Sequence, residues 1–209
     1  MAIAIDLNVG PQGIALGDGT DVQARAGRTG DLIVSELHGR YFEQVRSNRM
    51  FSAANQAAQA LSAALTTTYT GFLLYNPVGS NKGLVPNKVK FSQSAAPATF
   101  PVIGLIAGFA ATGGVTAQTT AIPVQSNQIG NTGKGVGIAL SAATIVTPTY
   151  LATFYDTVTT TATLPASGNP PVDLEGVYII LPGGFIAISS PTVATGWGWM
   201  SWCEVDLPL

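Results

Sequence analysis

The sequence predicts a mainly β protein: an antiparallel sandwich with jelly-roll connections, preceded by an extended N-terminal arm and one short helix. Three observations lead to this prediction. Charged residues make up only 10% of the chain, against about a quarter in ordinary globular domains. Short apolar or alternating runs separated by turn residues recur after Thr66, and helix-like composition is confined to the stretch before it.

The length of the chain, 209 residues, allows one core of useful size and an appendage. Its hydrophobic content of 46% excludes a disordered chain. Because the periodicity changes near Thr66, we expect residues 1–65 to form the arm and helix and residues 66–209 to form the sandwich.

The predicted arm is rich in glycine and arginine. Glycines are spread over its first thirty positions, which indicates an extended segment or a series of turns. The first 49 residues hold five of the nine cations, all arginine: Arg25, Arg28, Arg40, Arg46 and Arg49. A guanidinium group pairs with carboxylates and backbone carbonyls through a planar fork. This pattern indicates a docking arm, although a strand and loop with solvated charges fits it equally well.

An alanine-rich segment follows the arm. It carries seven alanines between Ala53 and Ala64, and Ser52 can cap its start. We therefore expect one short helix over Ser52–Leu65.

Strand patterns follow Thr66 at regular intervals. Lys88–Ser94 alternates polar and apolar residues, whereas Phe100–Ala110 is continuously apolar. The candidate strands are Thr66–Tyr75, Lys88–Ser94, Phe100–Ala110, Thr120–Gln125, Lys134–Ser141, Thr144–Asp156, Gly176–Leu181, Phe185–Ser190 and Gly196–Val205. About eight strands at this spacing favour an antiparallel sandwich, with a jelly roll as the leading case.

Two proline-containing stretches give further predictions about these strands. Pro148 lies inside a candidate strand, which predicts an edge position or a bulge there. The Pro182-Gly183-Gly184 turn lies between two apolar runs and predicts a tight hairpin.

Few side chains suit catalysis or metal binding. His38 is the single histidine, and Cys203 lies in the predicted last strand, where a small buried side chain is expected. Lys134 is not followed by Ser or Thr, so the glycine-rich stretch around it is not a phosphate-binding loop, and a tight hairpin explains it better.

The paired carboxylates also give no sign of catalysis. The pairs Asp173/Glu175 and Glu204/Asp206 are expected at solvated strand ends. We therefore expect a protein that is not an enzyme and has no cofactor, metal or small-molecule substrate.

The composition also bears on partners. A net charge of -2 and a pI near 5.2 argue against direct nucleic-acid binding. The longest apolar runs, Val102–Gly114 and Gly176–Ser190, are broken by Gly or Pro. A membrane-spanning helix needs about 20 apolar residues, so we expect no membrane contact.

Three tryptophans near the end form the strongest local feature. Trp197 and Trp199 share one face of a strand and Trp202 takes the other, provided that no bulge intervenes. One face should belong to the core and the other to a subunit contact, because exposed aromatic area marks interfaces. A carbohydrate platform is the alternative for the exposed face.

Three features of the chain occur together: the charged leader Arg25–Arg49 followed by Met50–Gln56, the neutral Thr/Gly/Ala-rich body, and the ending Ile180–Ile188 with Trp197–Leu207. In these features the chain resembles the head decoration or cement proteins of tailed bacteriophages. The resemblance implies a jelly-roll homotrimer on the outer capsid surface of a virion. Such a trimer would clamp adjacent subunits of the major capsid protein against the internal pressure of packed DNA, without a cofactor.

Two other functions remain open at this point. A tail or fibre component, including a receptor-binding one, would also be trimeric and Thr-rich. A jelly-roll carbohydrate-binding protein would use the tryptophans.

Overall fold

The computed structural model describes residues 39–62, 65–95, 102–112, 114–156 and 170–207. The chain divides into two compact units, Met1–Arg40 and Tyr41–Leu209. The predicted boundary between residues 65 and 66 is therefore wrong. The strand Met50–Ala54 already pairs with the last strand of the chain and belongs to the sandwich.

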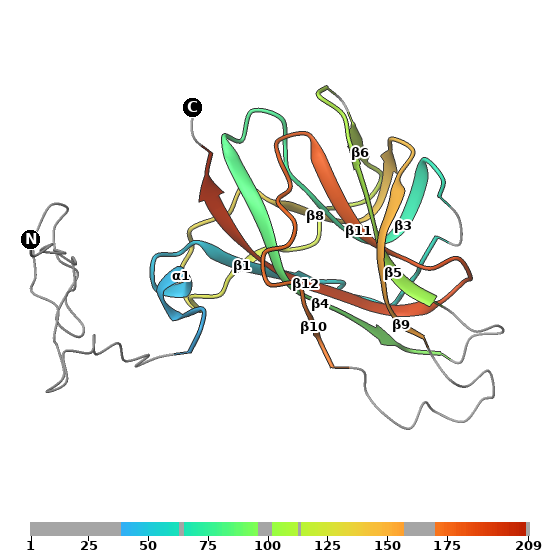
Figure 1. Cartoon of the computed structure of the whole chain (residues 1–209), viewed down its shortest axis with the longest axis horizontal. Helices are drawn as coiled ribbons and strands as arrows, with labels where there is room; N and C mark the ends of the chain where they lie inside the picture. The colour runs from blue at the N-terminus through green and yellow to red at the C-terminus, as the bar shows by residue number, and fades with distance from the viewer. Residues whose placement is uncertain (1–38, 63–64, 96–101, 113, 157–169, 208–209) are drawn as a thin grey trace, which may run out of the picture. The chain divides into compact units, whose positions relative to one another are not determined.

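The second unit consists of two sheets with antiparallel pairing (Figure 1). We name each by a central strand. The β12 sheet has the order β10 (Val172–Asp173), β4 (Lys82–Gln93), β12 (Thr195–Asp206), β1 (Met50–Ala54) and β7 (Gln125–Ser126), and β2 (Gln59–Ala60) also pairs with β12. The β11 sheet has the order β6 (Val115–Ala117), β8 (Ile138–Ile145), β3 (Thr68–Tyr75), β11 (Gly184–Ser189), β5 (Val102–Phe109) and β9 (Thr149–Asp156). The predicted antiparallel sandwich is confirmed.

The chain passes from one sheet to the other at most steps. Strands β1, β2, β4, β7, β10 and β12 belong to one sheet, and β3, β5, β6, β8, β9 and β11 belong to the other. Between consecutive strands the chain changes sheet at every step except β1 to β2, β5 to β6 and β8 to β9. The finer prediction of jelly-roll connections stays a prediction.

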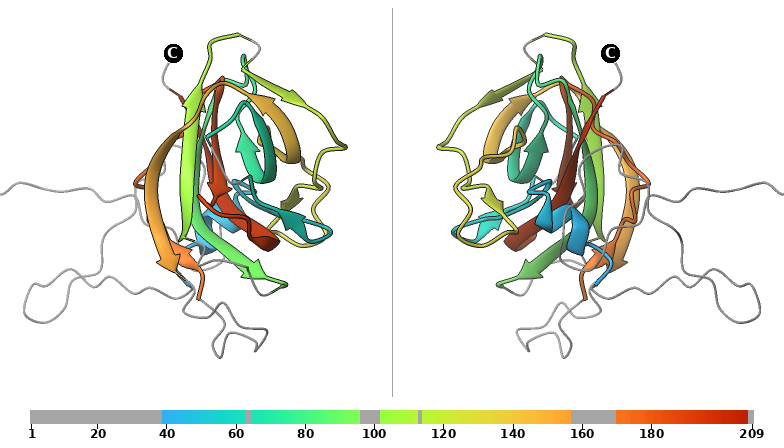
Figure 2. Two further views of the ribbon diagram at one scale, coloured as in Figure 1. Left: turned by 90° about the vertical axis from the view of Figure 1, so that its right-hand side faces the viewer. Right: turned by 90° about the vertical axis from the view of Figure 1, so that its left-hand side faces the viewer.

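The helix lies elsewhere than predicted. The α1 helix spans Phe42–Arg46, and the segment expected to be helical contains β1 and β2 instead. Alanine favours a helix only as a local preference. In β1 its small side chain fits between the sheets: Ala53 is buried opposite Met200 of β12. Figure 2 shows α1, in blue, beside the β12 sheet.

The turn at Leu181–Gly184 is present but does not join a hairpin. The N–H of Gly184 donates to the carbonyl of Leu181 at 2.8 Å, and Gly183 takes a φ of +90°, which glycine tolerates. Before the turn, Ile180 bridges Leu84 of the β12 sheet; after it, β11 pairs within the other sheet. The turn therefore carries the chain from one sheet to the other.

The other strand predictions are mostly correct in position. Pro148 separates β8 from β9, and β9 lies at the edge of its sheet, as the proline predicted. The hairpin predicted around Lys134 is wrong, since residues 127–137 form a loop between β7 and β8.

The main core lies between the sheets. Trp202 and Met200 point into it from β12, and both have an exposed fraction of 0%. Phe51 of β1 lies directly opposite Trp202, with ring centroids 6.4 Å apart. Fully burying one such side chain contributes about 1.5–3 kcal/mol to folding.

A second cluster lies on the other face of the β11 sheet. Ile186 and Ile188 of β11 point into the main core, and Phe185 and Ala187 join the second cluster. Because both of its faces are buried, β11 is apolar at each of these positions, without the alternation of a half-exposed strand.

A buried asparagine ties the two sheets together, and a buried tyrosine joins β3 to β11 within one sheet. The Asn55 side chain donates to the carbonyl of Gly71 at 3.0 Å and accepts from the N–H of Gly198 at 2.9 Å. The Tyr69 hydroxyl lies 2.7 Å and 2.6 Å from the carbonyl oxygens of Phe72 and Ile188, to which it donates. Two of the acceptors, the carbonyls of Gly71 and Phe72, lie at the bulge of β3, where ladder pairing is interrupted.

Candidate functional site

The tryptophans divide between the two faces of β12 as their spacing predicted. Trp202 is fully buried, Trp199 is half-buried, and Trp197 is 42% exposed. The intervening glycines face inward: a Cβ added at Gly198 would lie 3.1 Å from Ile188 of the opposite sheet. The Gly-Trp-Gly-Trp pattern thus lets the sheets approach closely and directs two indoles outward.

Polar and small residues surround the two outward indoles. Lys90 of β4 lies opposite Trp199, and Ser92 lies opposite Trp197. On the other side of β12, Ala54 is the partner of Trp199. Side chains directly opposite in an antiparallel pair lie about 5 Å apart. We call Trp197, Trp199, Lys90, Ser92 and Ala54 the tryptophan face.

The same exterior carries further cations toward α1. Lys88 of β4 lies 4.0 Å from the Asp173 carboxylate and 5.7 Å from the centre of the Tyr41 ring. The Tyr41 hydroxyl donates to Asp173 at 3.3 Å, so this contact joins the start of the second unit to β4 and β10.

The arginines predicted to dock are placed only in part. Arg46 is exposed at the end of α1 and lies 3.7 Å from Glu43, and Arg49 is exposed immediately before β1. Arg40 is exposed within the first unit, and Arg25 and Arg28 lie outside the described residues. The structure therefore places Arg46 and Arg49 on the folded second unit rather than on an extended arm.

A second surface, which the sequence reasoning missed, is an apolar groove of about 410 Å³. Its exposed side chains are large and uncharged: Phe109 of β5 (61% exposed), Leu151 of β9 (40%), and Val177 (73%), Ile179 (57%) and Leu181 (51%) of the segment before β11. Its floor includes Phe185 of β11. We call these six residues the apolar groove.

The segment Val177–Leu181 has an alternation that explains the groove. Tyr178 and Ile180 turn inward, and Ile180 exchanges two backbone hydrogen bonds with Leu84, at 2.7 and 3.0 Å. The outward positions are apolar as well, whereas a solvated strand face is usually polar. The run Val177-Tyr178-Ile179-Ile180-Leu181 was the signal available in the sequence.

A buried asparagine fixes this segment to the β3–β4 turn. Asn76 is fully buried, and its side-chain amide donates to the carbonyls of Lys82 and Ile180 at 2.7 and 2.8 Å. The hydroxyl of Ser80 donates to its side-chain oxygen at 2.6 Å. The apolar groove is thus built on a rigid support.

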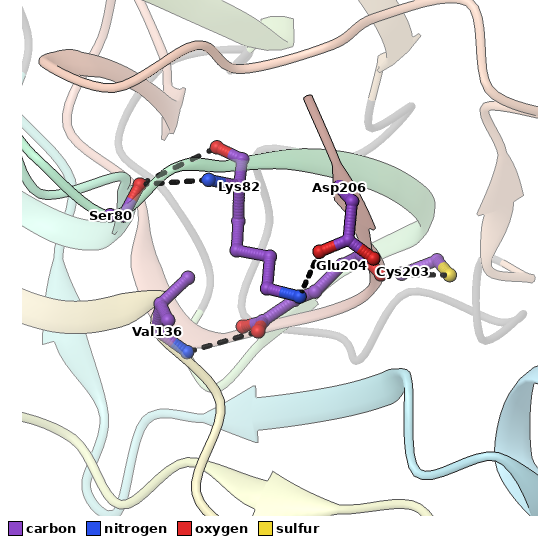
Figure 3. A network of polar contacts seen from close by, with 6 residues as sticks. All are labelled: Ser80, Lys82, Val136, Cys203, Glu204 and Asp206. Carbon is purple, nitrogen blue, oxygen red and sulfur yellow. Dashed lines mark hydrogen bonds and ion pairs between the residues drawn. The ribbon is translucent and has the colours of Figure 1, made fainter. Parts of the chain in front are cut away.

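Glu204 is a second feature that the sequence reasoning misjudged (Figure 3). It was expected at a solvated strand end, but its exposed fraction is 6%. Its carboxylate accepts N–H groups from Val136 and Gly137 at 3.0 Å each, and from the Trp202 indole at 3.3 Å. Its own N–H donates to the carbonyl of Arg49 at 2.8 Å. Glu204 therefore anchors the β7–β8 loop and the start of β1 to β12.

The neighbours of Glu204 have ordinary structural roles. Lys82 donates to the exposed carboxylate of Asp206 (Figure 3), and this hydrogen bond lowers the pKa of Asp206. Cys203 is buried, as predicted, and its burial raises the pKa of its thiol.

Comparisons with known proteins found no relative of this chain: no family model, curated protein or solved structure matches it. Within the described part of the chain, no group of three or more His, Cys, Asp or Glu side chains is arranged to hold a metal ion. No helix in that part has the length and apolar character needed to cross a membrane.

Proposed function

We propose that the chain is a structural virion protein that binds the outside of a phage capsid as a homotrimer. In this role it clamps adjacent subunits of the major capsid protein against the pressure of packed DNA. The observation that carries the proposal is the pair of exposed surfaces, one bearing an exposed tryptophan and one an apolar groove, on a sandwich that has few charges. Large exposed apolar patches mark interaction sites.

The fold supports the proposal. Strands that alternate between two sheets are what two Greek keys wound into a jelly roll produce. We therefore include jelly-roll connections in the proposal. The role is mechanical and needs a rigid body, which the buried ties of Asn55, Asn76 and Glu204 supply.

The cations near α1, beside the tryptophan face, suit attachment to an acidic protein surface. Lys88 lies on the exterior of β4, and Arg46 and Arg49 are exposed at the end of α1 and before β1. Interfaces favour aromatic and arginine side chains at their centre. Three copies acting together would multiply weak contacts with the capsid through effective concentration.

The test is reconstitution on heads that lack the protein. Wild-type protein should occupy discrete outer positions, and Arg49→Gln, which removes an exposed cation outside the tryptophan face, should lower the occupancy. Thr116→Glu on β6 changes the net charge by the same one unit on the other sheet and should leave occupancy unchanged. Occupancy that never rises above background, for any variant, contradicts the proposal.

The N-terminal arm can be tested in the same assay. A variant without residues 1–40 keeps the whole second unit, whereas a cut after Arg49 would remove the carbonyl that binds Glu204. We expect the shortened protein to fold and to lose attachment. Full occupancy by the shortened protein would mean that the second unit, and not the arm, binds the capsid.

A carbohydrate-binding role is a second candidate, favoured by one observation. Lys90 and Ser92 place polar donors beside Trp197 and Trp199, as sugar-binding platforms require. A titration with neutral oligosaccharides, followed by tryptophan fluorescence, tests it. A saturable change that Trp197→Ala abolishes would support this candidate over attachment to a capsid.

A further inference from the structure

The tryptophan face and the apolar groove lie at opposite ends of β4. Ser92 of β4 pairs with Trp197, and Leu84 bridges Ile180 beside the groove. Eight residues of extended strand separate these two β4 positions, which corresponds to roughly 25 Å. One subunit can therefore present the two surfaces to two different neighbours.

The apolar groove has the area of an interface. The exposed parts of its five protruding side chains amount to roughly 500 Å², more than half of the ~800 Å² that each partner contributes to a standard interface. Every residue that lines it is uncharged. A volume of about 410 Å³ falls within the range of sites that enclose a bound group, so an aromatic side chain fits it in size and chemistry.

Trp197 is the most exposed of the three tryptophans and matches the groove in chemistry. Its indole is 42% exposed. Its cross-strand neighbour is the small Ser92, and the partner of Trp199 on β1 is the small Ala54. Tryptophan is among the residue types enriched at binding hot spots, which lie in well-packed, desolvated pockets.

We infer that the Trp197 indole of one copy is seated in the apolar groove of the next copy. The contact joins two different surfaces, so it is head-to-tail, and three such contacts close into a ring. This inference rests on the proposed homotrimer and names its subunit contact. Every residue that lines the groove is uncharged, so seating the indole there places it beside no unpaired ion.

The experiment measures the mass of the purified full chain by sedimentation from 0.1 to 100 µM. Ile179→Glu places a charge in the groove, and Trp197→Ala removes the inserted side chain. Each should raise the concentration needed for trimer formation at least thirty-fold, the effect of a hot-spot residue. Ile129→Glu is the matched control, because Ile129 is 91% exposed on another loop, and it should behave as wild type. Circular dichroism confirms that all variants are folded.

A mixture of the two variants gives the decisive result. Ile179→Glu keeps its indole and Trp197→Ala keeps its groove, so together they should form a one-to-one complex that neither forms alone. A mixture that stays monomeric, or an Ile179→Glu protein that trimerises as wild type, overturns the inference. Monomeric wild-type protein at 100 µM overturns it as well. The proposed capsid role is judged separately, by occupancy on heads.

Discussion

Replacing Glu204 with glutamine tests how the β12 strand holds the loop before β8. The two side chains have nearly the same shape, so the change isolates the acceptor chemistry. Glutamine keeps one oxygen for the N–H groups of Gly137 and Trp202, but it turns an NH₂ group toward the N–H of Val136. Two donors then face each other in a site that is only 6% exposed.

The magnitude follows from these bonds. A hydrogen bond to a charged group contributes about 1.5–3 kcal/mol to folding. The variant loses the bond from Val136 outright, and the bonds from Gly137 and Trp202 are weakened. We expect Glu204→Gln to lower the free energy of unfolding by about 2–4 kcal/mol. In a domain of this size that corresponds to a fall in Tm of roughly 5–15 °C.

Urea unfolding followed by tryptophan fluorescence measures the effect, at one fixed protein concentration because association shifts apparent stability. Asp206→Asn is the control: it changes an exposed carboxylate two residues further along the same strand and should have a much smaller effect. A Glu204→Gln protein within about 0.5 kcal/mol of wild type would refute the anchoring role.

Three further changes test other parts of the fold. Tyr69→Phe should cost about 1–3 kcal/mol, because two buried carbonyls lose their donor. Burial raises the pKa of Tyr69 in the folded protein, so the free energy of unfolding of wild type should fall as pH rises above the ordinary tyrosine pKa near 10. The urea midpoint of Tyr69→Phe should fall less steeply than that of wild type over the same pH range. Gly137→Ala should cost about 1–3 kcal/mol by thermal unfolding, since its Cβ would lie 2.9 Å from the fully buried Trp202 indole. Because Lys82 lowers the pKa of Asp206, the stability advantage of wild type over Asp206→Asn should be present at neutral pH and vanish as pH falls through that lowered value.

The fold class was predictable because it depends on regular patterns. The alternation in Lys88–Ser94, the apolar run of β5 and the turn at Pro182–Gly184 each indicated a strand or a turn that the structure contains. The faces taken by Trp197 and Trp202 followed from strand geometry alone, because β12 keeps its alternation.

The alanine-rich segment was mispredicted because tertiary packing decided its structure. Ala53 is buried in the core opposite Met200, and no local preference reveals that pairing. The role of Glu204 depends on a loop some seventy residues earlier in the chain, and the groove depends on residues from β5, β9 and the segment before β11. Sites assembled from such distant residues have no local spacing for a motif to capture.

An electron-microscopy map of the purified particle tests the central claim most directly. The proposal predicts density for the two-sheet body of Tyr41–Leu209 on the outside of the capsid, in groups of three that each bridge adjacent major capsid subunits. A capsid surface without this density, in particles that contain the chain by mass spectrometry, would contradict it.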